Sequence, residues 1–266
     1  MSYYTRLNKA FEKALHLPLT NHSRYVLVSD CHRGTGTSND NFLKNRSLYF
    51  AALRHYYQTG YTYIELGDGD ELWENHSMSQ ITEAHKEVFD LLALFRKQNR
   101  LYMLYGNHDM ILQKNHERYS GIILENNTSP DVYLTHGHQA DVWNSTFWRL
   151  TCFLVRHLWK PLERFGALDP TSAAKNYKRK KTTEQRLHTW AKQENHILIT
   201  GHTHRPVLSE SDLHYCNSGS CVHPYGMTCL EIEHKNIRLV KWSLSTKPDM
   251  TLYVAREVLA GPLALS

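Results

Sequence analysis

The chain has 266 residues, of which 41% are hydrophobic and 21% charged, and its formal net charge is +5. This is the composition of a globular domain, without an apolar stretch long enough for a transmembrane helix or a signal peptide. The mild basic charge is compatible with an anionic substrate, nucleic acid or a membrane surface, and five cysteines without framework spacing indicate reduced thiols and a cytoplasmic location.

Strand-like and helix-like segments alternate along the chain. The predicted helices are 5–16, 39–60 and 79–99. The predicted strands are 24–28, 61–66, 100–105, 131–135 and 196–200, followed by a hairpin over 228–242 that turns at His234–Asn236. This alternation predicts an α/β fold whose sheet is at least partly parallel and covered on both faces.

Residues 141–195 interrupt the alternation, because they contain no convincing strand. The first part carries an apolar helical stripe of Trp143, Phe147, Leu150, Leu154 and Leu158, widened by Trp148, Val155, Trp159 and Leu162. A second helix is predicted over 169–195, with Asp169 as N-cap and Pro170 in its first turn. We expect one domain over 1–266 with a helical cap inserted at 141–195.

The apolar stripe of this cap has three interpretations. We favour a helix that packs on its neighbours and on the core. The stripe is also compatible with a groove for an acyl chain or a nucleobase. A third interpretation is a membrane-surface helix that places Arg149, Arg156, Lys160 and Arg164 near anionic lipid.

Polar side chains directly follow each of the five predicted strands. In chain order they include Asp30 and His32, then Asp68, then Asn107 to Asp109, then His136, and finally His202 and His204. Ligands bind beyond the carboxyl ends of the strands in open α/β sheets, and neighbouring strands lie about 4.8 Å apart. We therefore expect these side chains to converge on one point.

Carboxylate, imidazole and amide groups together suit borderline divalent metals such as Mn, Fe, Co or Zn. Sulfur ligands are absent from the set, which argues against a structural thiolate zinc site. The seven candidate ligands are Asp30, His32, Asp68, Asn107, His136, His202 and His204. Because this exceeds the needs of one tetrahedral ion and a carboxylate can bridge, the set favours two ions of the kind that act on phosphorus.

The motifs DCH (30–32), GDGDE (67–71), GNHD (106–109), HGH (136–138) and GHTH (201–204), with NSGS at 217–220, resemble those of the calcineurin-like metallophosphoesterase superfamily. The resemblance implies a four-layer αββα sandwich and a di-metal phosphoesterase that cleaves a phosphomonoester or a nucleotide-type pyrophosphate bond by attack of a metal-bound hydroxide. Manganese is the expected metal, with Fe, Zn or Co as alternatives.

The resemblance also implies a role for each residue. Asp30, His32 and His204 would bind the first metal, Asn107, His136 and His202 the second, and Asp68 would bridge them. His108 would protonate or stabilise the leaving oxygen, and Asp109 would orient His108 or serve as a helix N-cap. Asp70 and Glu71 would lie near the site, the second acid without direct ligation.

A narrower resemblance concerns GDGDELW (67–73), GHTHRP (201–206) and the position of the cap. These are similar to the corresponding parts of UDP-2,3-diacylglucosamine pyrophosphohydrolases. Those enzymes typically carry arginine where this chain has His108. Histidine there is more typical of general phosphomonoesterases, phosphodiesterases and a divergent branch of the pyrophosphohydrolases.

The expected partner is a small phosphorylated substrate, nucleotide- or lipid-linked. Its candidate contacts are Arg205, Lys175, Lys178 and Arg179, with Lys180 and Lys181 also in the basic run. Arg33 faces either substrate phosphate or solvent, and Cys31 is expected to be a packing residue. The alternatives are a nuclease or cyclic-nucleotide phosphodiesterase, which the basic cap helix supports, and a catalytically silent interaction module.

Overall fold

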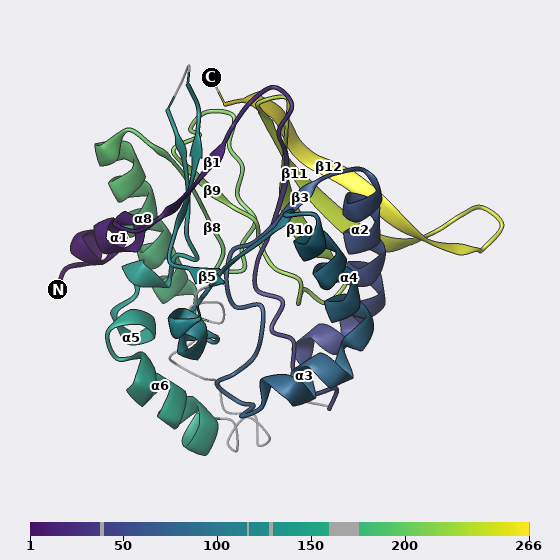
Figure 1. Ribbon diagram of the computed structural model, residues 1–266, viewed down its shortest axis with the longest axis horizontal. Coiled ribbons are helices and arrows are strands. Elements are labelled where there is room, and N and C mark those ends of the chain that lie inside the picture. The colour runs from purple at the N-terminus through teal and green to yellow at the C-terminus, as the bar shows by residue number, and fades with distance from the viewer. Residues whose placement is uncertain (38–39, 116, 128–129, 160–175, 266) are drawn as a thin grey trace.

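Two β-sheets lie face to face, with helices on both outer sides, in the computed structural model (Figure 1). The structure describes residues 1–37, 40–115, 117–127, 130–159 and 176–265. Within these residues one sheet has seven strands in the order β12-β11-β10-β2-β3-β4-β5, and the other has five in the order β1-β6-β7-β8-β9. This is the expected α/β sandwich.

The seven-stranded sheet joins a parallel half to an antiparallel half. The parallel strands are β2 (Arg24–Val28), β3 (Thr62–Glu65), β4 (Leu101–Leu104) and β5 (Arg118–Tyr119). The antiparallel strands are β10 (Met227–Glu233), β11 (Asn236–Thr246) and β12 (Leu252–Ala264), with β10 pairing β2. In the five-stranded sheet, only β6 and β7 pair antiparallel. Its strands are β1 (Leu15–Pro18), β6 (Ile122–Glu125), β7 (Val132–Leu134), β8 (Ile197–Thr200) and β9 (Tyr215–Asn217).

Helices connect the strands and cover the sheets. The α-helices are α1 (Tyr3–Phe11), α2 (Arg46–Gln58), α3 (Met78–Ala84), α4 (Lys86–Lys97), α5 (Val142–Ser145), α6 (Trp148–Leu154) and α8 (Tyr177–Glu194). Short 3₁₀ turns form η1 (Asn41–Asn45), η2 (Met110–Lys114) and η3 (His138–Ala140), and η4 (Val155–Trp159) is a π-helical turn. Among the described residues, no helix is both long and apolar enough to cross a membrane.

Side-chain alternation along the strands produces the layers. In β2, Val26 and Val28 belong to the cluster that includes α2 and α4, whereas Tyr25 and Leu27 belong to the cluster between the two sheets. A third cluster packs α1 and α8 on the outer side of the five-stranded sheet. The strands are therefore buried on both faces, as their continuous apolar sequence predicts.

The five strands predicted before the hairpin are all present, as β2, β3, β4, β7 and β8. The 228–242 hairpin is also present and turns at residues 234–235. The predicted helix over 79–99 is instead two helices, separated at His85, whose buried ring contacts Asp40 at 2.8 Å. The predicted helix over 5–16 ends at Phe11, because Leu15–Pro18 pairs with β6 as a strand. Strands β1, β5, β6, β9 and β12 were not predicted from the sequence.

The described parts of the cap, 141–159 and 176–195, contain helices and no strand. Asp169, Pro170 and Leu162 lie outside the described residues. The favoured packing of the apolar stripe is wrong for four of the seven members whose side chains the structure describes, because each of the four is exposed by two fifths or more of its surface. These are Trp143, Phe147, Leu150 and Leu158. Val155 is buried, so the cap contacts the body through a narrower face than its sequence predicts.

Candidate metal centre

The loops that follow β2, β3, β4, β7 and β8 carry the seven predicted ligands, and six of these side chains are buried. Five of the seven have left-handed backbone, which non-glycine residues rarely adopt and which clusters at functional sites. These are Asp30 (φ 54°), His32 (49°), Asp68 (50°), His202 (66°) and His204 (56°). The strand ends therefore hold these side chains in an unfavourable local conformation that the surrounding structure maintains.

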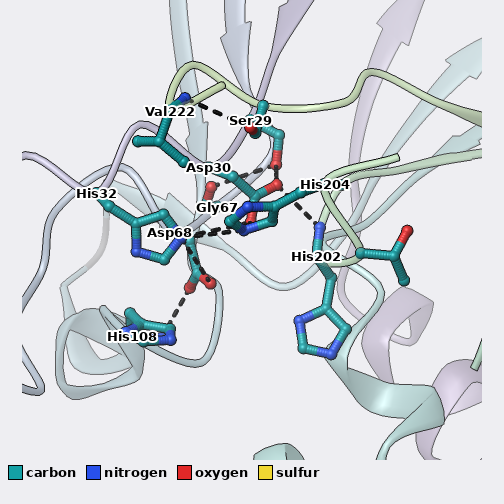
Figure 2. A network of polar contacts seen from close by, with 12 residues as sticks. Ser29, Asp30, His32, Gly67, Asp68, His108, His202, His204 and Val222 are labelled. Carbon is teal, nitrogen blue, oxygen red and sulfur yellow. Dashed lines mark hydrogen bonds and ion pairs between the residues drawn. The ribbon is translucent and has the colours of Figure 1, made fainter. Parts of the chain in front are cut away.

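Asp30, His32 and His204 form the first cluster (Figure 2). Asp30 Oδ1 lies 3.1 Å from His204 Nε2 and 3.7 Å from His32 Nε2. The second carboxylate oxygen of Asp30 accepts a hydrogen bond from the His202 amide at 2.9 Å. One oxygen is thus anchored by backbone, which leaves the other directed at the two imidazoles.

Asp68, His136 and His202 form the second cluster. Asp68 Oδ2 lies 3.1 Å from His136 Nε2 and 4.0 Å from His32 Nε2, so the same oxygen faces both clusters. Its Oδ1 accepts a hydrogen bond from the His108 amide at 2.7 Å. This is the placement that a bridging carboxylate requires.

Close packing of backbone at these loops depends on glycine. A Cβ on Gly106 would lie 2.2 Å from Asp68 Oδ1, and a Cβ on Gly201 would lie 1.8 Å from the Ser29 hydroxyl and 2.5 Å from Asp30 Oδ2. Only a residue without a side chain lets these strand ends approach the carboxylates.

Four buried polar atoms of the predicted ligands make no hydrogen bond in the described part of the chain, although two of them, Asp30 Oδ1 and His136 Nε2, have an ionisable neighbour at 3.1 Å. They are Asp30 Oδ1, Asn107 Oδ1, His136 Nε2 and His202 Nε2. Buried polar atoms are almost always paired, since leaving one unpaired costs about 1–3 kcal/mol. All four are atom types that coordinate divalent metals, so this donor set fits metal ions at both clusters.

The hydrogen bonds on the far side of the imidazoles select the tautomer that a metal needs. His136 Nδ1 lies 2.9 Å from the Leu66 carbonyl, which only accepts, so Nδ1 carries a proton and the neutral ring has its lone pair on Nε2. His32 Nδ1 lies 2.9 Å from Glu71 in the same way. Carboxylate or carbonyl partners of this kind orient metal-binding histidines.

The pKa values of Asp68 and His136 in the second cluster are strongly shifted. Burial alone would raise the pKa of Asp68, but His136 and His108 beside it hold that pKa below its usual range. Burial disfavours charge on His136, yet Asp68 raises its pKa to about 9. A divalent cation between the two groups would take the place of that proton, since metal binding releases protons from its ligands.

His108 is held by residues of the loop that follows β3. Its Nδ1 lies 2.8 Å from Glu71, and its ring stacks on the Trp73 indole with centroids 4.2 Å apart and an interplanar angle of 25°. The His108 side chain is 22% exposed, more than that of Glu71 at 8%, so it is the accessible member of this group. The contact expected from Asp109 is therefore made by Glu71, which also holds His32.

Asp109 instead belongs to a buried charge network beneath the loops. Its carboxylate accepts hydrogen bonds from the amides of Gly106 and Gly69 and lies 3.4 Å from Arg118. It occupies the N-cap position of η2 without a side-chain capping bond. Arg33 lies in the same network, fully buried, with two bonds to Glu65 and one to Asp70. Both predicted environments of Arg33, substrate phosphate and solvent, are wrong.

The predicted substrate contacts have different environments. Arg205 is 56% exposed and pairs with Glu184 of α8. Arg179 forms a two-point pair with Asp141, whose carboxylate lies 4.0 Å from His202 Nε2. Lys178 is exposed, and Lys175 lies outside the described residues.

Sequence reasoning gave no definite role to Glu71, Trp73 or His138, which the structure places at the site. His138 is buried beside His136 and His202, with an unpartnered Nδ1 among the described residues, and burial lowers its pKa to about 3. The sequence signal that could have indicated the role of Glu71 was its position three residues after Asp68. Cys31 is fully buried in the core, as expected of a packing residue.

A family model described as calcineurin-like phosphoesterase matches residues 23–206. No functionally curated protein matches the chain. Among solved structures, a predicted phosphoesterase from Streptococcus pneumoniae TIGR4 is 15% identical, with 89% of this chain and 97% of that chain covered and a TM-score of 0.38. Vps29 from Chaetomium thermophilum is 11% identical, with 89% and 96% covered and a TM-score of 0.45. Likeness at this level is no evidence on activity.

Proposed function

The chain belongs to the calcineurin-like phosphoesterase family, and on this premise we propose that it hydrolyses a phosphomonoester or a nucleotide-type pyrophosphate bond with two divalent metal ions. One observation carries the proposal: two adjacent clusters, Asp30 with His32 and His204 and Asp68 with His136 and His202, each bring ligand atoms within 4.8 Å of one another. Buried ligand atoms of Asn107 and His202 also lack hydrogen-bond partners among the described residues.

Asp30, His32 and His204 would hold one ion, Asn107, His136 and His202 the other, and Asp68 would lie between them. When bound, such a pair of cations lowers the pKa of a coordinated water and offsets charge on the phosphoryl group. Manganese is the proposed metal, because mixed oxygen and imidazole ligands without thiolate suit it, with Fe, Zn or Co as alternatives.

We assign proton delivery to His108. Glu71 accepts from Nδ1, so Nε2 remains for the leaving oxygen of the substrate. Burial lowers the pKa of His108, but the charges of Glu71 and Asp68 outweigh it and raise that pKa, which favours the protonated, donating form. A positioned general acid contributes about 10²–10⁴-fold to the rate.

The exposed apolar residues of the cap favour a substrate with an apolar part, or a site of action at a membrane surface. Trp143, Phe147, Leu150 and Phe153 are between 44% and 59% exposed. A lipid-linked sugar nucleotide, as in the pyrophosphohydrolases that share GDxxExW, is the finer proposal. Sedimentation with anionic vesicles at low salt tests it, and protein that stays in the supernatant contradicts the membrane part.

The nuclease alternative has less support. Its basis is the basic run of the cap helix, but Arg179 in that run is paired with Asp141.

All five cysteines are free, which supports the proposed cytoplasmic location.

The test is a panel of phosphomonoesters, sugar nucleotides, dinucleotides, phosphopeptides and short nucleic acids, each with added manganese. We expect hydrolysis of phosphomonoesters or of compounds with a nucleotide-type pyrophosphate bond, which are the sugar nucleotides and dinucleotides of the panel. Asp68→Asn should lose bound metal and activity together, whereas His108→Ala should keep its metal and lose about 10²-fold or more in kcat. A protein that binds no transition metal and cleaves nothing in the panel contradicts the proposal.

A further inference from the structure

Arg156 joins the cap to the loop that follows β3. Its Nε donates to the Trp73 carbonyl at 2.7 Å, and its Nη2 donates to the Leu72 carbonyl at 3.0 Å. Arg156 lies in η4, more than 80 residues away from these partners in the sequence. Because the guanidinium is planar and presents its donors in a fixed fork, two bonds to consecutive carbonyls determine the position of this short segment.

The same segment makes three separate contacts with His108. The Glu71 carboxylate lies 2.8 Å from its Nδ1, the Trp73 indole stacks on its ring, and the Leu72 amide donates to its carbonyl at 3.2 Å. Trp73 is 3% exposed, so its indole has little freedom to move independently of its backbone. Displacement of residues 71–73 would therefore displace the His108 imidazole.

We propose that Arg156 is a positioning residue, through which the cap holds residues 71–73 where they orient His108. The inference depends on the proposed function of His108 as the proton donor. It gives the cap a part in the chemical step, in addition to any contact that the cap makes with the substrate. A displacement of about 1 Å at a catalytic group is enough to cost about 10²-fold in rate.

A purely structural role for Arg156, in which it only attaches the cap to the rest of the protein, makes different predictions. In that case, loss of Arg156 lowers the stability of the protein but leaves kcat for a small substrate unchanged. Arg100 offers a matched control, because it also donates to two main-chain carbonyls, those of Tyr57 in α2 and of Tyr61 just before β3. Among the described residues its side chain contacts Tyr57, Tyr61, Phe95 and Gln98, none of which belongs to the metal centre.

The experiment compares Arg156→Ala, Arg156→Lys, Trp73→Ala, the double variant with both alanines, and Arg100→Ala. The readouts are kcat and KM for p-nitrophenyl phosphate, bound manganese and Tm. We expect Arg156→Ala to lower kcat about 10–100-fold with KM and metal content unchanged, Arg156→Lys to recover part of the loss, and Arg100→Ala to lower Tm alone. Because Arg156 and Trp73 act through the same segment, the loss in the double variant should be smaller than the product of the two single losses.

An unchanged kcat in a folded Arg156→Ala or Arg156→Lys protein overturns the proposal, as does a double variant whose loss is the product of the two single losses. A second readout needs no activity. In metal-free protein, the stacked indole shifts the His108 ring proton resonances, and Arg156→Ala should move them toward their positions in Trp73→Ala. Wild-type protein that hydrolyses nothing would refute the proposed function, while unmoved resonances in Arg156→Ala would refute the positioning role.

Discussion

Replacement of Arg33 with methionine removes the central cation of the buried charge network beneath the metal loops. The Arg33 guanidinium donates to Glu65 at 2.8 and 2.9 Å and to Asp70 at 2.8 Å, and all three side chains are fully buried. Methionine keeps much of the apolar stem but none of the donors. The variant therefore leaves two carboxylates in the interior with fewer partners.

Loss of one partner from a buried ion pair costs about 3–5 kcal/mol, because the remaining charge stays desolvated. Arg118 lies 2.9 Å from Asp70 but 3.6 Å from Glu65, so it compensates Asp70 better than Glu65. We therefore expect a loss near the lower end, about 3–4 kcal/mol in the free energy of unfolding. For a domain of this size that corresponds to about 6–16 °C in Tm.

Thermal unfolding followed by circular dichroism measures the change, with Arg96→Met as the control. Arg96 pairs with Glu117 at 3.1 Å, but both side chains are more than half exposed, and such pairs contribute about 0–1 kcal/mol. Arg33→Lys should fall between wild type and Arg33→Met, since it keeps the charge and loses the fork. A Tm for Arg33→Met within about 2 °C of wild type would refute this reasoning.

Three further predictions concern the site and its support. Manganese at about 100 times its Kd should stabilise the protein by about 2.7 kcal/mol, and a chelator should reverse this stabilisation. A Tm that changes with neither manganese nor chelator would contradict the metal assignment. Glu71→Gln should lower activity or metal affinity about 10–100-fold, since Glu71 holds both His32 and His108, and unchanged kinetics and metal titration would exclude that role. The third prediction concerns Asp40: burial would raise its pKa, but hydrogen bonding by His85 outweighs this and the pKa is lowered. The contribution of Asp40 to stability is therefore present above about pH 4 and is lost as the pH falls further. In urea titrations, the difference in unfolding free energy between wild type and Asp40→Asn should shrink on acidification. A difference that is constant with pH would contradict the pairing of Asp40 with His85.

The five strands β2, β3, β4, β7 and β8 and the ligand-bearing loops that follow them were predictable because their signals are local. An apolar run followed by Asp30 and His32, or by Asp68, is visible within ten residues of sequence. The edge strands β1, β5, β9 and β12 and the interior strand β6 were not predictable in this way. Leu15–Pro18 continues a helical pattern in sequence and becomes a strand only because β6 lies beside it.

The sequence by itself determined which residue types stand at the strand ends, and hence that the site suits divalent metals and phosphate chemistry. Only the tertiary structure decided which neighbour each side chain meets. Glu71, not Asp109, contacts the His108 ring, Arg33 is buried between carboxylates, and Arg156 reaches from the cap to the same loop. The physical reason is that composition and periodicity act along the chain, whereas hydrogen bonds and ion pairs form between segments that only folding brings together.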